Sequence, residues 1–173
     1  MGSSLSRSAI DKLGKRLVRT VVADQDLQQL FAYQRECIEA LEQTLKVIAE
    51  TVQNDPPRGV PVHVTHRVKT VETLIDKLRR GTALSRMQDV VGIRVVGDLG
   101  LSEQDELVSR LVRRFPGARV DDRRVHPSHG YRAVHVVPKI DGFSAEIQVR
   151  TSLQHAWANA TEQLADQWGR AIR

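Results

Sequence analysis

The chain has 173 residues, of which 40% are hydrophobic and 27% charged, as is typical of one folded globular domain. Its formal charge of +5 favours an anionic partner such as a nucleotide or a nucleic acid, and its 4% aromatic content argues against a single-strand-binding surface built from stacked rings. The single cysteine, Cys37, excludes a disulfide framework, so we expect a cytoplasmic protein. No apolar run is long enough to span a bilayer, and we expect no contact with a membrane.

The first 58 residues predict two helices. Apolar residues recur at helical spacing between Ile10 and Val21, which predicts a short amphipathic helix. We interpret the basic residues between them as the solvated face of this helix. From Asp26 to about Gln53 they recur every three or four residues, which predicts one long helix with a single apolar face. We therefore expect residues 1–58 to be an N-terminal helical region that packs on a core formed by residues 59–173, within one compact domain.

A basic cluster follows an extended segment at residues 60–65. A helix is predicted over residues 71–80. Three cations and a hydroxyl, in the first turns of this helix and at the end of the preceding extended segment, are spaced so that they could face the same side: Arg67, Lys69, Thr73 and Lys77. Such a cluster suits a polyphosphate, because lysine supplies point charges and arginine binds two oxygens at once or stacks on a base. A solvated basic helix face is the alternative, and it is favoured when the cluster is taken alone.

The segment from Asp89 to Asp98 is apolar on both faces, which predicts a central strand covered on each side. A carboxylate at the start of such a strand is costly to bury unless it caps a helix, pairs with a cation or binds a metal. Asp89 is therefore either a cap with Arg86 nearby or a ligand.

The remaining elements complete an α+β pattern, with a mixed central sheet of about five strands flanked by helices. They are a helix over residues 102–115, a short strand over 118–120, a charged loop over 121–129 and a final helix over 153–168 that is expected to pack back on the sheet.

A hairpin is predicted around Asp141-Gly142, because a type I′ turn needs positive φ at both central residues. Ile140 then pairs with Phe143, and counting along the strands places His135 opposite Gln148 and Val136 opposite Ile147. Alternation places one polar set on one face of the hairpin: Tyr131, His135, Lys139, Glu146, Gln148 and Arg150. The alternative is a half-buried hairpin whose polar face is merely solvated. Pro138 lacks an N–H, and a bulge there would shift the pairing by one residue.

Four motifs from about Val62 to Trp168 resemble, in this order, the synthetase domain of the RelA/SpoT alarmone enzymes. They are Arg67-x-Lys69 with Thr73 and Lys77, the strand from Gln88 to Arg94, the segment from Gly130 to His135, and the strand from Glu146 to Thr151 followed by His155 and Trp157. The resemblance implies a nucleotidyltransferase-like fold in a small, single-domain alarmone synthetase. Such an enzyme moves the β,γ-pyrophosphate of ATP to the 3′-hydroxyl of GDP or GTP, making (p)ppGpp.

The resemblance also implies a role for each matching residue. Asp89 and Glu146 would be catalytic and would hold Mg²⁺, and Glu146 would assist deprotonation of the attacking hydroxyl. The ATP-binding residues would be Arg67, which stacks on adenine, with Lys69, Thr73, Lys77 and Arg94. The acceptor-binding residues would be Tyr131, which stacks on the base, with His135, His129, Arg123, Arg124, Gln148, Arg150 and Ala158.

The chain departs from the family pattern ahead of Tyr131. Arg123 and Arg124 stand where a lysine is frequent, and His129 stands where asparagine or serine is common. One alternative is therefore a toxin of the same family, which pyrophosphorylates the 3′ CCA end of tRNA or makes adenosine alarmones and has an antitoxin protein as its partner. A second is a catalytically silent domain that binds a nucleotide or a protein partner, against which the intact Asp89 and Glu146 argue.

Overall fold

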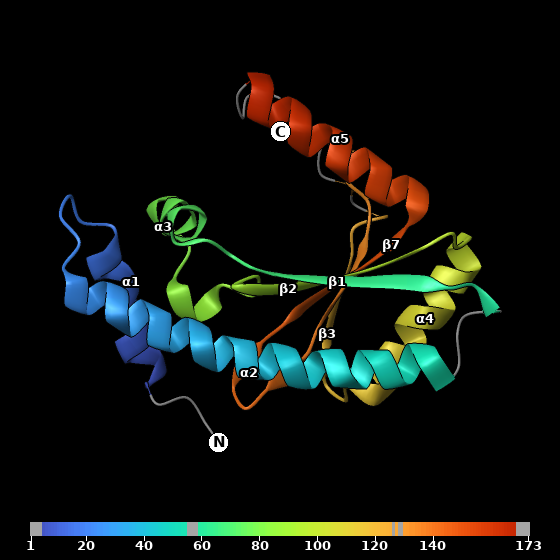
Figure 1. Ribbon diagram of the computed structural model, residues 1–173, viewed down its shortest axis with the longest axis horizontal. Helices are drawn as coiled ribbons and strands as arrows, with labels where there is room; N and C mark the ends of the chain where they lie inside the picture. Colours follow the sequence, from blue (N-terminus) through green and yellow to red (C-terminus); the bar gives the residue numbers. More distant parts are fainter. Residues whose placement is uncertain (1–4, 55–58, 126, 128–129, 169–173) are drawn as a thin grey trace. The chain divides into compact units, whose positions relative to one another are not determined.

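The computed structural model describes residues 5–54, 59–125, 127 and 130–168 (Figure 1). The chain forms two compact units. The first unit contains Met1–Lys46, His66–Gly92 and Lys139–Glu146, and the second contains Val47–Thr65, Ile93–Pro138 and Ile147–Arg173. The boundary expected between residues 58 and 59 stays a prediction. Among the described residues, no helix is both long enough and apolar enough to cross a membrane.

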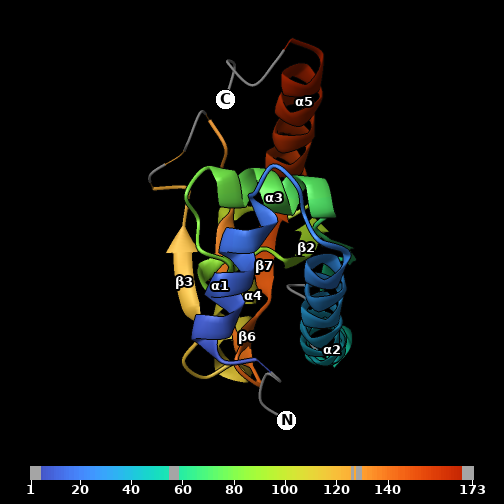
Figure 2. The same ribbon diagram turned by 90° about the vertical axis from the view of Figure 1, so that its left-hand side faces the viewer.

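The first unit is mainly helical. It contains α1 (Arg7–Leu17), the first part of α2 (Asp24–Asn54), α3 (Val71–Arg79) and the short helix η2 (Leu84–Arg86). The Ser6 side chain begins α1 by accepting a hydrogen bond from the Ala9 N–H at 3.2 Å. An ideal Cβ on Gly14 would lie 3.0 Å from the Leu84 Cβ, so the glycine lets η2 approach α1 closely. Figure 2 shows α1 and α3 in this unit.

The chain also contains a five-stranded sheet with the strand order β1-β2-β7-β4-β3. Its strands are β1 (Val62–Val68), β2 (Val91–Gly97), β3 (Arg119–Asp122), β4 (Val134–Val137) and β7 (Glu146–Thr151), and the second unit adds α4 (Leu101–Arg114) and α5 (Ser152–Trp168). Helix α4 packs against β4, and its residues Leu107 and Leu111 are fully buried, as are Val136 and Ile147 of the sheet. The predicted α+β fold with a mixed sheet of five strands flanked by helices is confirmed.

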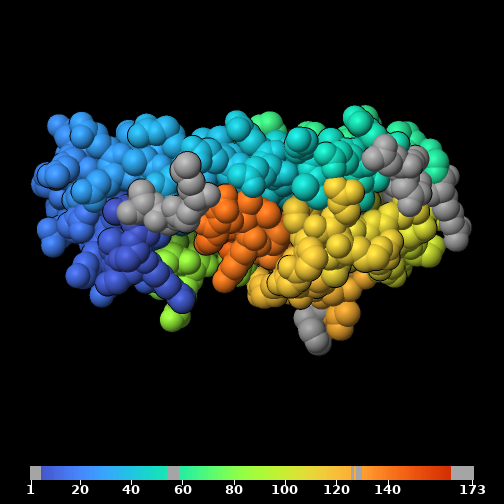
Figure 3. Space-filling model, turned by 90° about the horizontal axis from the view of Figure 1, so that it is seen from below, coloured from blue at the N-terminus to red at the C-terminus, as the bar shows by residue number. Residues whose placement is uncertain are grey.

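The predicted hairpin is present as β5 (Lys139–Ile140) and β6 (Phe143–Ser144), with Ile140 paired to Phe143. Asp141 and Gly142 both have positive φ, of 51° and 90°, as the predicted turn requires. In β4 and β7, His135 pairs with Gln148 and Val136 with Ile147. The predicted register is therefore confirmed, and Pro138 interrupts the ladder without shifting it. Phe143 packs against Tyr33 of α2, with ring centroids 5.8 Å apart, and Figure 3 shows the hairpin (orange) beside this part of α2 (light blue).

The expectation that the last helix packs back on the sheet through its apolar stripe is wrong. Leu153 and Trp157 of this stripe are 84% and 52% exposed, whereas Ala158 is 1% exposed. Helix α5 starts directly after β7 and leads away from the sheet (Figure 1). Its small residue Ala158 is buried, while Leu153 and Trp157 keep half or more of their surface exposed. Periodicity shows that a helix has one apolar face, but it does not show what covers that face.

Candidate functional site

The first unit brings Asp89 together with two of the predicted lysines, a set that we call the Asp89–lysine cluster. The Lys77 Nζ on α3 lies 2.7 Å from the Asp89 Oδ1, and the Lys69 Nζ, just after β1, lies 3.1 Å from the Asp89 Oδ2. Both carboxylate oxygens are therefore bound to ammonium groups. Of the alternatives left open by the sequence, a cap with Arg86 or a ligand, the structure supports neither directly, because these lysines are the ion-pair partners of Asp89.

Electrostatics in this cluster favours charged side chains. Burial of Asp89 opposes its ionisation, but the hydrogen bond from Lys77 and the charges of Lys69 and Lys77 outweigh that effect and hold the Asp89 pKa below its ordinary value. One carboxylate faces two ammonium groups, so the cluster carries one excess positive charge. A compact cationic site of this kind suits a polyanion.

The backbone of Lys69 is fixed from two sides. Its N–H donates to the Val90 carbonyl at 2.9 Å, and its own carbonyl accepts from the Gln34 side chain of α2 at 2.9 Å. Gln34 is 8% exposed. In the sequence it falls among the apolar positions of the long helix, so its role in holding Lys69 was missed. The sequence did contain one indication of this role, namely a single glutamine among the apolar positions of the long helix.

Thr73 and Arg67, the other ATP-binding residues predicted near this cluster, are both exposed. The Thr73 hydroxyl donates to the Thr70 carbonyl at 3.0 Å, and Thr70 caps α3 by accepting from the Thr73 N–H. Thr73 and Lys77 are one turn apart on this helix, hence on the same side. Contact of Thr73 and Arg67 with ATP stays a prediction.

Glu146 also belongs to the first unit, where it begins β7 and is partly exposed. Asp89 precedes β2 by two residues, and an ideal Cβ on Gly92 of β2 would lie 4.0 Å from the Glu146 carbonyl oxygen. One predicted catalytic carboxylate thus lies just before a strand and the other at the first residue of the neighbouring strand. Within the described residues no group of three or more metal-binding side chains occurs. Two carboxylates nevertheless fit Mg²⁺, which commonly takes one or two protein carboxylates and completes its shell with water and phosphate oxygens.

The second unit brings together four of the predicted acceptor-binding residues, Tyr131, His135, Gln148 and Arg150, which we call the Tyr131 cluster. The Tyr131 hydroxyl lies 2.8 Å from the His135 Nε2 and accepts from the Arg150 Nη2 at 3.0 Å. The same Nη2 donates to the Gln148 Oε1 at 2.7 Å. The Arg150 guanidinium also lies over the Tyr131 ring, 5.0 Å from its centroid. The tyrosine is therefore held both by its hydroxyl and by its ring face.

Arg150 is an unusual member of this cluster, because it is a charged residue that is only 2% exposed. Among the described residues, its buried Nε and Nη1 find no hydrogen-bond partner, and neither does the Nδ1 of His155 on α5. The His155 Nε2 lies 3.1 Å from the Asn159 amide nitrogen. An amide nitrogen can only donate, so the Nε2 accepts, and a neutral His155 then carries its proton on the Nδ1. These unmatched N–H groups call for oxygen acceptors, such as those of a phosphate or a carbonyl.

His155 is kept neutral by its surroundings. Burial lowers the pKa of His155, and the charges of Arg150 and Arg94 lower it further, against the opposing effect of Glu162. Arg94, predicted to bind ATP, lies on β2 in the second unit, 3.8 Å from Glu162 of α5. Its contact with ATP stays a prediction.

Trp157 of α5 packs against the chain just before Tyr131. An ideal Cβ on Gly130 would lie 2.9 Å from the Trp157 ring, and Gly130 has a φ of 77°. Only glycine meets both requirements without strain. The predicted acceptor residue Ala158 follows on α5 and is 1% exposed.

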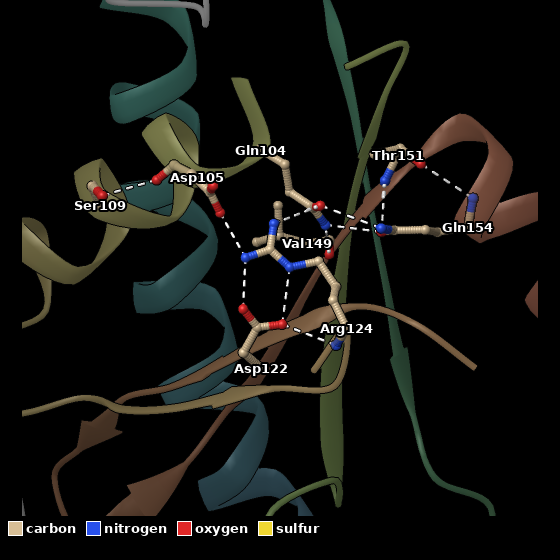
Figure 4. A network of polar contacts seen from close by, with 8 residues as sticks. All are labelled: Gln104, Asp105, Ser109, Asp122, Arg124, Val149, Thr151 and Gln154. Atoms are coloured by element: carbon tan, nitrogen blue, oxygen red, sulfur yellow. Dashed lines mark hydrogen bonds and ion pairs between the residues drawn. The ribbon is translucent and has the colours of Figure 1, made fainter. Parts of the chain in front are cut away.

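The arginines predicted to contact the acceptor from the loop after β3 are engaged by acidic residues. The Arg123 Nη2 lies 3.2 Å from the Asp121 carboxylate. The Arg124 Nη2 lies 2.6 Å from both Asp122 and Asp105, and the Arg124 Nε donates to Asp122 at 2.9 Å (Figure 4). Hydrogen bonds to Asp122, partly offset by burial, raise the pKa of Arg124, and the reverse effect lowers the pKa of Asp122. Contact of these arginines with the acceptor stays a prediction, and His129 lies outside the described residues.

Gln104 of α4 was missed in the sequence, although it is fully buried. Its amide nitrogen donates to the Val149 carbonyl of β7 at 2.9 Å and to the Gln154 side chain of α5 at 2.8 Å, while its oxygen accepts from the Arg124 Nη1 at 3.2 Å (Figure 4). The only sequence signal was a polar residue on the buried side of an amphipathic helix, three positions before Leu107.

Comparison with known proteins finds the family described as the region found in RelA/SpoT proteins, which matches residues 66–168. A protein of Mycobacterium tuberculosis, named only as uncharacterised, is 45% identical over 114 residues, which cover 64% of this chain and 42% of that protein. The GTP pyrophosphokinase YjbM of Bacillus subtilis is 26% identical over 157 residues, covering 82% of this chain and 74% of the relative. The chain thus spans less than half the length of the mycobacterial relative.

Among solved structures, small alarmone synthetase 1 of Bacillus subtilis bound to its product pppGpp is 25% identical, with a TM-score of 0.63 and 84% of each chain covered. The same synthetase bound to AMPCPP is 22% identical, with a TM-score of 0.57 and 84% and 81% covered, and it supports the fold alone. The family match includes both the Asp89–lysine cluster and the Tyr131 cluster and spans more than half of the chain. The chain therefore belongs to the RelA/SpoT family.

Proposed function

We propose that this protein is an ATP-dependent pyrophosphokinase that transfers the β,γ-pyrophosphate of ATP to the 3′-hydroxyl of GDP or GTP. The observation that carries the proposal is the Asp89–lysine cluster, in which two ammonium groups hold a partly buried carboxylate. The GTP pyrophosphokinase and the product-bound synthetase among its relatives support a guanosine acceptor. Cytoplasmic location is part of the proposal, in keeping with the single free cysteine.

ATP binding at the Asp89–lysine cluster involves an exchange of partners. Lys69 and Lys77 are both paired with Asp89. Triphosphate oxygens would compete for these ammonium groups, and Asp89 would then be available to hold Mg²⁺ together with Glu146. Bound there, Mg²⁺ would neutralise charge on the phosphate oxygens and orient them. Arg67, Thr73 and Arg94 complete the ATP-binding residues in this proposal.

The Tyr131 cluster supports the acceptor half of the proposal. Its tyrosine ring is a platform for a base, and contacts with Arg150 and His135 hold that ring in place. The unmatched N–H groups of Arg150 and His155 favour an acceptor that is rich in oxygen atoms, such as a phosphorylated nucleoside. Gln148 and Ala158 belong to the same site in this proposal.

The proposed reaction is a displacement at the β-phosphorus of ATP. The 3′-oxygen of the acceptor forms a bond to this phosphorus, the bond from the phosphorus to the oxygen bridging it to the α-phosphate breaks, and AMP leaves with the electron pair. Glu146 accepts the hydroxyl proton. The lysines of the Asp89–lysine cluster stabilise charge on the transferred group, since positioning and electrostatics provide most of the catalysis in phosphoryl transfer.

The decisive experiment offers γ-labelled ATP and Mg²⁺ to the purified protein with GDP, GTP, AMP or bulk tRNA in separate reactions. We expect label on GDP or GTP, with one AMP released for each labelled product. The matched control is Asp89→Asn protein in the same reactions. Absence of transfer to every acceptor, from protein shown to be folded by circular dichroism, would overturn the proposal.

A second candidate acceptor is the 3′ CCA end of tRNA, in a toxin that an antitoxin protein would restrain. The formal charge of +5 favours this candidate, because basic proteins bind nucleic acid phosphates. Label that appears on tRNA but not on GDP or GTP would select it, and label on AMP would select an adenosine alarmone. Binding of labelled ATP without any transfer would instead indicate a catalytically silent nucleotide-binding domain.

A further inference from the structure

The polar network around Arg124 connects four elements of the second unit. Starting after β3, Arg124 binds Asp122 and Asp105 and donates to Gln104 of α4. Gln104 donates in turn to Val149 of β7 and to Gln154 of α5. These bonds join β3, α4, β7 and the start of α5 (Figure 4).

At the α5 end, the network includes the cap of the helix. The Thr151 hydroxyl accepts from the Gln154 N–H at 3.2 Å, and the Gln154 side chain accepts from the Thr151 N–H at 3.1 Å. This reciprocal pair is a capping box, which fixes the direction in which α5 leaves β7. Gln154 therefore has two roles, since the same oxygen also accepts from Gln104.

Two elements of this network, β7 and α5, carry residues that contact Tyr131 or its neighbour Gly130. The Val149 carbonyl, to which Gln104 donates, lies between Gln148 and Arg150 on β7, and these two side chains belong to the Tyr131 cluster. Helix α5, whose first turn Gln154 caps, carries Trp157 against Gly130. The Arg124 side chain also donates to Asp122 at the end of β3. Next to it, the Arg123 N–H donates to the carbonyl of Ala133, two residues beyond Tyr131.

We propose that Arg124, Gln104 and Gln154 are positioning residues that hold the Tyr131 cluster in the geometry needed to bind the acceptor. Arg124 acts in this proposal through Asp122, Asp105 and Gln104 and not by touching the acceptor. A bidentate guanidinium pair is well suited to the task, because its planar fork fixes orientation as well as distance. The proposal rests on the proposed function, since it assigns the Tyr131 cluster to the acceptor.

The test compares variants at the two ends of the network. Arg124→Gln removes the charged fork, and Gln154→Ala removes the capping box, whereas Gln154→Glu keeps an oxygen acceptor for both Thr151 and Gln104. In steady-state assays we expect Arg124→Gln and Gln154→Ala to raise the acceptor KM about tenfold and to leave the ATP KM within about twofold, because small misplacements of binding groups have effects of this size. Gln154→Glu should stay close to wild type, and Arg124→Lys should be intermediate.

Arg114→Gln is the matched control, because Arg114 ends α4 and pairs with the exposed Glu50 at 2.6 Å, away from the network. It should change neither KM. Equal changes in the KM of ATP and of the acceptor would overturn the proposal in favour of a general structural role. An effect of Arg124→Gln without any effect of Gln154→Ala would also overturn it, in favour of direct contact between Arg124 and the acceptor.

Hydrogen–deuterium exchange gives a readout that does not depend on activity. In ligand-free protein, Arg124→Gln and Gln154→Ala should increase exchange in the peptide that spans residues 130–137, whereas Arg114→Gln should not. Unchanged exchange in both variants would overturn the proposal. If the wild-type protein transfers no pyrophosphate, the proposed function fails, and the exchange comparison still decides whether the network holds Tyr131.

Discussion

The Asp89–lysine cluster and the Tyr131 cluster differ in how their polar groups are satisfied. Asp89 is bound on both oxygens by the flexible, partly exposed side chains of Lys69 and Lys77. Arg150 is fully buried and leaves two nitrogens without a partner. In the first cluster both carboxylate oxygens are paired with cations, whereas the second contains buried hydrogen-bond donors that lack a partner in the described part of the chain.

This difference suggests two ways of binding a nucleotide. Long lysine side chains can leave a carboxylate for a phosphate at small cost, because ion pairs of partly exposed groups contribute little net stability. A buried arginine with unmatched donors gains most from a ligand that supplies oxygen acceptors, because an unpaired buried polar group is costly. We therefore expect substitutions at Asp89 to act mainly on catalysis, and substitutions around Tyr131 to act mainly on acceptor affinity.

The largest effect is expected from the two carboxylates. Asp89→Asn and Glu146→Gln should each lower kcat about 1,000-fold, since loss of a group that stabilises transition-state charge has effects of this order. Affinity for ATP without Mg²⁺ should not fall in Asp89→Asn, because Lys69 and Lys77 lose a competing anion. Activity would be followed with γ-labelled ATP and affinity by calorimetry. Activity of either variant within a few-fold of wild type would contradict the proposal that the Asp89–lysine cluster binds ATP for the transfer.

The next largest effect is expected on the acceptor KM when the ring or the hydroxyl of Tyr131 is removed. Tyr131→Ala should raise the acceptor KM by roughly 10–100-fold, the range for loss of one base–aromatic stack, and should leave the ATP KM unchanged. Tyr131→Phe is the matched control, since it keeps the ring under Arg150 and removes only the hydroxyl that contacts His135 and Arg150. We expect it to raise the acceptor KM less than Tyr131→Ala. An unchanged acceptor KM in both variants would contradict the stacking role.

Local chemistry explains which parts of these clusters were predictable. The Asp141-Gly142 turn determined the register of β4 against β7, and alternation along the strands then placed Tyr131, His135, Gln148 and Arg150 on one face. Both rules act over a few residues. The spacing of Lys69 and Lys77 was likewise visible, although a solvated basic helix face was the favoured interpretation of the cluster taken alone.

Long-range polar contacts were not predictable, because no local pattern encodes them. The Gln104 amide bonds to a carbonyl 45 residues away, and Gln34 bonds to one 35 residues away. A buried glutamine in a helix does not reveal its partner in the sequence. The same limit applies to α5, where periodicity identified the apolar stripe through Leu153 and Trp157 but not its exposure.

A smaller effect on stability should distinguish Gly117 from Gly130, which have similar backbone angles in the second unit. Gly117 and Gly130 have φ of 80° and 77°, but only at Gly130 would a Cβ meet another group, the Trp157 ring at 2.9 Å. Gly117→Ala should lower the free energy of unfolding by about 1 kcal/mol, the strain of a left-handed residue. Gly130→Ala should lower it by about 2 kcal/mol and also weaken acceptor binding. Equal losses in urea denaturation would show that Trp157 moves aside freely.

The smallest effect tests the charge of the Arg124 network through pH. Arg124 holds the pKa of Asp122 below its ordinary value, so the stabilisation is complete above about pH 4, the unfolded pKa of an aspartate, and is lost as the pH falls through the lower folded value. At pH 7 we expect Arg124→Gln to melt about 2 °C below wild type, as befits a partly exposed ion pair. Below pH 4 the difference in melting temperature should shrink, and it should vanish once Asp122 is protonated in the folded protein. A difference that persists at pH 2.5 would assign the stability of this loop to packing of the Arg124 stem and not to its charge.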